Sequence, residues 1–115
     1  MKVSIELDVF SGRPNPSWEL TTSESGELLK QLSPLPEADK NKAEFFDGLG
    51  YRGFVITVQP ADNAGSSPTI FRVFKGFILM NDKVFSDKNS VEKKLMEQAR
   101  NKGFADIIES IGIKE

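Results

Sequence analysis

The chain has 115 residues, of which 38% are hydrophobic and 28% charged, a composition typical of one globular domain and not of a disordered segment. It contains no cysteine and no histidine, which excludes disulfides, thiolate metal sites and catalytic pairs that use either residue. Its net charge of −2 gives no electrostatic reason to expect a nucleic-acid partner. We therefore expect residues 1–115 to form a single domain.

Residues 2–10 alternate apolar and polar side chains, which predicts a strand with one buried face. The segment has no continuous apolar stretch and so does not look like a signal peptide. No other stretch is long and apolar enough to span a bilayer. We expect a cytoplasmic protein with no membrane partner, and the lack of cysteine fits a reducing compartment.

The strand pattern stops at residues 11–16. Gly12 permits unusual backbone conformations, while Pro14 and Pro16 each remove a hydrogen-bond donor and fix φ. The sequence predicts a stiff, extended loop here, with a possible short strand at 17–20.

A helix is predicted at 22–33, because Thr21 and Glu24 have the spacing of a capping box and leucines follow at helical intervals. Pro34 ends the pattern. The polar segment that follows could contain a helical turn at 37–46.

Several strand patterns and two helical patterns complete the chain. The strands are placed at 53–59, 69–75 and 77–80, the last two continuing across a bulge at Gly76, with a tight turn at 81–82 leading into 84–85. The helices are placed at 89–102, capped by Asn89 or Ser90 and ended by Gly103, and at 104–111.

The predicted order is β-(β)-α-β-β-β-α-α, which favours an α+β fold: a largely antiparallel sheet of 4–5 strands with helices on one face. The other face would carry Glu6, Asp8, Thr57 and Gln59 and would meet solvent or a partner. We interpret the excess of basic residues in 88–102 as a solvated helix face.

The stretch from Asp8 to Trp18 is the first candidate site. Arg13 offers a planar fork of donors suited to a carboxylate or phosphate, and Asn15 adds a donor and an acceptor. Trp18 adds a large amphipathic surface. In the structural alternative, Asp8 holds Arg13, Asn15 satisfies the loop backbone and Trp18 fills the core.

Tyr51 and Arg52 form the second candidate site, at the start of a predicted strand. Beside Arg13 and Trp18 they would make an aromatic, cationic corner suited to an acidic side chain, a C-terminal carboxylate or a small anionic ligand. The alternative is a turn with a packed tyrosine and an arginine that extends to solvent.

The runs Phe-Ser-Gly-Arg-Pro-Asn-Pro-Ser-Trp at 10–18 and Gly-Tyr-Arg-Gly at 50–53 resemble a family of small bacterial proteins. That family has Phe-Ser-Gly-Arg-x-Asn-Pro-x-Trp and Gly-Tyr-x-Gly signatures, and no activity is associated with it. The resemblance covers most of the chain. It implies that the two stretches meet in space, and it implies no substrate or cofactor.

The sequence thus indicates a binding module for an unknown protein, peptide or small anionic ligand, with no cofactor, no assigned metal and an open oligomeric state. One alternative is a single-strand RNA binder, because 52–56 is similar to the aromatic strand of RNA-recognition motifs. Another is a small enzyme that uses Asp8 and Glu19 as acid and base. Calcium could bind at 62–63, or at 81–82 together with Asp87, although turns explain both stretches.

Overall fold

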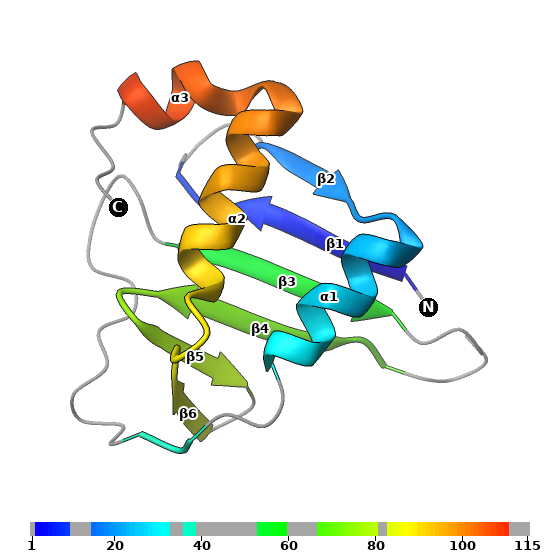
Figure 1. Ribbon diagram of the computed structural model, residues 1–115, viewed down its shortest axis with the longest axis vertical. Helices are drawn as coiled ribbons and strands as arrows, with labels where there is room; N and C mark the ends of the chain where they lie inside the picture. The colour runs from blue at the N-terminus through cyan, green and yellow to red at the C-terminus, as the bar shows by residue number, and fades with distance from the viewer. Residues whose placement is uncertain are drawn as a thin grey trace.

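The computed structural model describes residues 2–9, 15–32, 36–38, 53–59, 67–80 and 83–110, which form a sheet and a layer of helices. Helices α1 (Thr22–Leu32) and α2 (Val91–Ala99) cross one face of the sheet (Figure 1). The predicted α+β architecture with helices on one face is therefore confirmed. The strands are β1 (Lys2–Leu7), β2 (Ser17–Glu19), β3 (Phe54–Gln59), β4 (Thr69–Phe74), β5 (Phe77–Met80) and β6 (Lys83–Ser86).

The sheet has the strand order β2-β1-β3-β4-β5-β6, and each neighbouring pair is antiparallel. Six strands are present among the described residues, which corrects the prediction of four or five. Ile5 of β1 lies between Trp18 of β2 and Ile56 of β3, so these three side chains share the face that the helices cover.

The extra strand comes from a hairpin at Lys75 and Gly76. Both residues have positive φ, 50° and 85°, as in a two-residue type I′ turn, and Phe74 pairs directly with Phe77. The prediction of one strand continuing across a bulge at Gly76 is wrong, because the chain reverses there. The following hairpin pairs Met80 with Lys83, although the predicted turn residues 81–82 lie outside the described residues.

Residues 36–38 run along the outer edge of β6. Glu37 bridges to Phe85, and the Ala38 N–H donates to the Val84 carbonyl at 2.7 Å. This part of the predicted helical turn at 37–46 is therefore extended, and 39–46 lies outside the described residues. The contact covers a sheet edge that would otherwise expose unpaired backbone groups.

The capping box at the start of α1 is confirmed. The Thr21 N–H donates to Glu24 Oε1 at 2.9 Å, and the Glu24 N–H donates to Thr21 Oγ1 at 3.2 Å. The Glu24 side chain also lies 3.7 Å from Lys102 Nζ, which connects α1 to the segment after α2.

The cap of α2 differs from the prediction. Asp87 accepts hydrogen bonds from the Val91 and Glu92 N–H groups at 2.7 and 3.0 Å, whereas Ser90 has φ 55° and makes no side-chain cap bond. Asn89 instead donates to the Gln31 carbonyl at 2.9 Å. The cap comes from Asp87 because the left-handed residue before the helix turns the chain back toward that carboxylate.

Gly103 interrupts the C-terminal helical region with φ 101°, as predicted from its position. The wide turn η2 (Arg100–Phe104) contains it and leads into α3 (Ala105–Ser110). The five basic residues of the preceding region are all exposed, in agreement with a solvated face: Lys88, Lys93, Lys94, Arg100 and Lys102.

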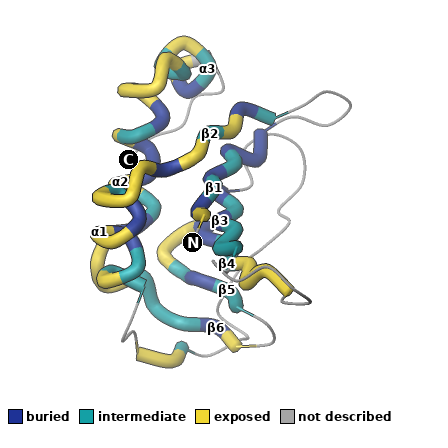
Figure 2. Tube along the Cα trace, turned by 90° about the vertical axis from the view of Figure 1, so that its right-hand side faces the viewer, coloured by how far each residue is buried: buried dark blue, intermediate teal, exposed yellow. Residues whose placement is uncertain are grey.

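The hydrophobic core fills the space between the sheet and the helices, where Figure 2 shows the buried residues of α2 turned toward the strands. β1 contributes alternate residues, and α2 contributes residues at helical spacing, because each element buries one face. The side chains of these two elements with no exposed surface are Val3, Ile5, Leu7, Val91, Leu95 and Ala99.

Candidate functional site

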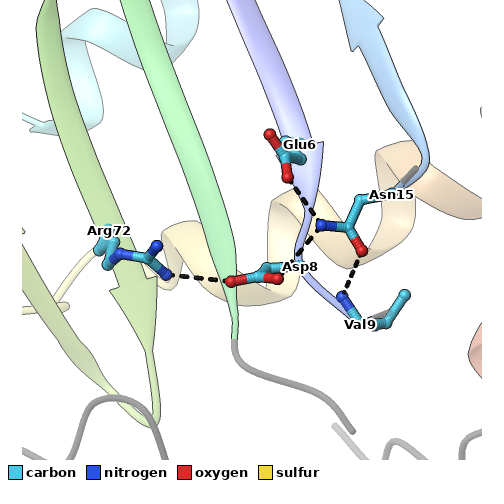
Figure 3. Close-up of polar contacts among 5 residues, drawn as sticks. All are labelled: Glu6, Asp8, Val9, Asn15 and Arg72. Atoms are coloured by element: carbon cyan, nitrogen blue, oxygen red, sulfur yellow. Dashed lines mark hydrogen bonds and ion pairs between the residues drawn. The ribbon is translucent and has the colours of Figure 1, made fainter. Parts of the chain in front are cut away.

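Asn15 connects the two ends of the segment 10–14. Its Oδ1 accepts a hydrogen bond from the Val9 N–H at 3.0 Å, so one side chain joins the residue before the segment to the residue after it. Its Nδ2 donates to Glu6 Oε2 at 2.7 Å and to Asp8 Oδ1 at 3.2 Å (Figure 3). Every hydrogen-bonding atom of this amide is therefore used to hold the end of β1.

Asp8 lies at the centre of the same arrangement. Its carboxylate is 10% exposed and lies 3.1 Å from Arg72 Nη1, which pairs it with a guanidinium from β4 (Figure 3). Its backbone N–H donates to the Gly53 carbonyl at 2.9 Å. We call Glu6, Asp8, Asn15 and Arg72 the polar network.

The strand register explains why these side chains meet. Glu6 pairs with Val55 of β3, and Val55 pairs with Arg72 of β4, so the three form one row on the face away from the helices. Asp8 follows Glu6 at a spacing of two and stays on that face. Thr57 and Gln59 follow Val55 along β3 at intervals of two residues, and Val55 pairs with Glu6. Glu6, Thr57 and Gln59 therefore share this face, as predicted.

Arg72 is the functional candidate that the sequence analysis missed. Its position on the network depends on a partner 64 residues away, which no local pattern supplies. The available signal was the alternation in β4, where the buried Val73 places Arg72 on the opposite face.

Trp18 lies on the other face of the sheet. Its ring is 5.6 Å from the Phe104 ring in a stacked arrangement and 6.5 Å from the Phe54 ring in an edge arrangement. Its Nε1–H donates to Gln98 Oε1 at 3.1 Å. Trp18 therefore packs against the core, and it does not share a surface with Asp8 and Asn15.

The predicted site residues thus fall into three groups. Asp8 and Asn15 are in contact on the face away from the helices, and Trp18 is on the helix-covered face. Arg13, Tyr51 and Arg52 lie outside the described residues, so their predicted corner stays a prediction.

The RNA alternative needs an aromatic side chain that is free to stack on a base. Phe54, the aromatic residue of the proposed signature, has no exposed surface and lies on the face that the helices cover. The neighbouring Arg72 is paired with Asp8. This geometry does not favour base stacking on β3.

The enzyme alternative needs Asp8 and Glu19 to converge on one point. Glu19 pairs with Ser4, four residues before Asp8, which separates the two by about 13 Å along the strand. Glu19 is also exposed and lies 3.5 Å from Lys2 Nζ. The two carboxylates therefore face different neighbours.

Asp87 is the described residue of the two stretches where calcium could bind and which turns also explain; it uses both carboxylate oxygens to cap α2. Within the described part of the chain, no group of three or more Asp or Glu residues is placed to hold a metal ion. A bilayer-spanning helix is likewise not found in the described ranges.

Comparison with known proteins gives no assignment. No protein-family model matches the chain, and no match is found among curated proteins or solved structures.

Proposed function

We propose that the chain is a small binding module that recognises an anionic group, in a peptide or a small molecule, beside the end of β1. The observation that supports this is the Asn15 side chain, which accepts a hydrogen bond from the Val9 N–H and donates to the carboxylates of Glu6 and Asp8. Both ends of the segment 10–14 are thereby fixed. A segment with fixed ends loses less conformational entropy when it binds a partner.

Arg13 is the contact residue of this proposal, because a guanidinium binds a carboxylate through two parallel hydrogen bonds. The carboxylates of the polar network are occupied in holding the segment: Asp8 pairs with Arg72, and Glu6 accepts the Asn15 amide. Asp8, Asn15 and Arg72 are thus positioning residues, and Trp18 supports the core beneath them.

The test uses an immobilised array of peptides rich in Asp and Glu, each matched by a copy with Asn and Gln. Wild type should bind a subset of the acidic peptides, and Arg13→Ala should lose at least tenfold in affinity, about 1.4 kcal/mol. Arg100→Ala is the matched control, since it removes an exposed arginine next to α2.

Thermal unfolding separates a binding role from a structural one. Arg13→Ala should keep the melting temperature of wild type, whereas Asn15→Ala should lower both the melting temperature and the affinity. If Arg13→Ala and Arg100→Ala bind the acidic peptides equally, the proposal is wrong. A large loss of stability in Arg13→Ala would make the segment structural.

A further inference from the structure

A groove with a volume of about 310 Å³ lies between α1 and α2. The helices are connected at both ends of this groove. At one end Asn89 Nδ2 donates to the Gln31 carbonyl at 2.9 Å, and at the other Lys102 Nζ lies 3.7 Å from Glu24 Oε2. The groove is therefore held between two polar contacts, and its size is at the lower end of the range for small-molecule sites.

The two walls carry opposite charges that do not meet. Glu27 projects from α1 and Lys94 from α2, and both line the groove. Both side chains are exposed, and neither side chain forms an ion pair or hydrogen bond with another described residue. Glu24, the other acid at the groove, is already bonded to Thr21 and Lys102. One carboxylate and one ammonium group are thus available on facing helices.

Gln98 adds an oriented donor to the α2 wall. Its Oε1 accepts the Trp18 indole N–H at 3.1 Å, so the opposite atom of the amide, Nε2, points away from the indole. Leu28 and Leu95 lie beneath the groove and are 4% and 0% exposed, so its accessible apolar surface comes mainly from the aliphatic parts of the other lining side chains, such as Lys94 and Gln31. The groove therefore combines a donor-rich wall and an acidic wall, with aliphatic surface between the charged groups.

We propose that this groove binds a free α-amino acid with an aliphatic side chain. The ligand carboxylate would lie at Lys94 and Gln98 Nε2, the ammonium group at Glu27, and the side chain against the aliphatic parts of the lining residues. A zwitterion satisfies both charges at once, which neither a simple cation nor a simple anion does. This site lies on the helix side of the sheet, away from the polar network, and does not depend on the function proposed there.

The test is a titration of the isotope-labelled protein followed by two-dimensional NMR, with L-leucine as the probe. Saturable shifts are expected at the backbone amides of Leu95 and Gln98. N-acetyl-L-leucine lacks the ammonium group and L-leucinamide lacks the carboxylate, so each should bind at least about tenfold more weakly. Equal binding of all three compounds would overturn the assignment of the two charges.

Two matched pairs of variants locate the site. Lys94→Ala should weaken L-leucine binding about tenfold, whereas Lys93→Ala, which removes the adjacent exposed lysine, should leave it unchanged. Glu27→Gln should weaken binding similarly, and Glu109→Gln on α3 should not. The proposal is overturned if L-leucine gives no saturable shift in the wild type, or if Lys94→Ala and Lys93→Ala bind it equally.

Discussion

Gly53 gives the most specific prediction about the fold, because any other residue at this position would be unfavourable for two separate reasons. Its φ is 90°, a conformation that costs an L-residue about 1–2 kcal/mol. A Cβ added there would lie 2.1 Å from the Val73 carbonyl oxygen and 2.9 Å from the Phe74 Cβ. Backbone cannot rotate out of the way as a side chain can, so overpacking adds about 1–3 kcal/mol.

Gly53→Ala should therefore lower the free energy of unfolding by about 2–5 kcal/mol, combining the two effects. Gly76→Ala is the matched control, since Gly76 has φ 85° but nothing within 4 Å of an added Cβ. It should lose only the conformational part, about 1–2 kcal/mol. Urea unfolding followed by circular dichroism measures both variants, and equal losses would refute the steric part of the reasoning.

Three further predictions concern caps and the core. Asp87→Ala removes two helix-capping bonds and should cost about 1–2 kcal/mol in urea unfolding, while Ser90→Ala should change little. Trp18→Ala should lose roughly 3 kcal/mol in the same assay, because it leaves a cavity beside Phe104; a loss below about 0.5 kcal/mol would contradict core packing. The Thr21 N–H lowers the pKa of Glu24 below its usual 4.5, so the stability that this carboxylate contributes is present above pH 4.5 and lost as the pH falls through the lowered pKa. The difference in unfolding free energy between wild type and Glu24→Gln should therefore shrink toward low pH, and a difference independent of pH would contradict this.

Local patterns predicted much of the fold. The alternation in 2–10 gave β1 and its buried face, and the spacing of Thr21 and Glu24 gave the start of α1, since both depend on neighbours in sequence. The end of the second helical region at Gly103 could be predicted for the same reason.

The predictions were wrong where the structure depends on a partner far away in sequence, or on a backbone conformation that is unusual for the residue type. Lys75 adopts a positive φ that sequence statistics assign mainly to Asn, Asp and Gly, so the hairpin was interpreted as a bulge. The cap of α2 comes from Asp87 because Ser90 takes a left-handed conformation, and a single residue type does not reveal that.

The candidate site was predicted only in part for the same physical reason. Asp8 and Asn15 are only seven residues apart, and a contact between residues so close in sequence needs little loop-closure entropy. Arg72 reaches them only because β3 aligns β4 with β1. Trp18 lies on the helix-covered face because it pairs with Ile5. Predicting this face requires the register between β1 and β2, which the strand pattern alone does not give.

The polar network is difficult to explain by stability alone. The Asp8–Arg72 ion pair is partly buried, so desolvation offsets much of what the two charges gain by attraction. Val55 lies in the same row, so an apolar surface could have continued across these strands. Charged and amide groups add directional contacts, because the hydrogen bonds of Asn15 are satisfied in only one orientation of its side chain. The network fixes the chain at Val9 and Asn15, and under the proposed function this positions the segment between them.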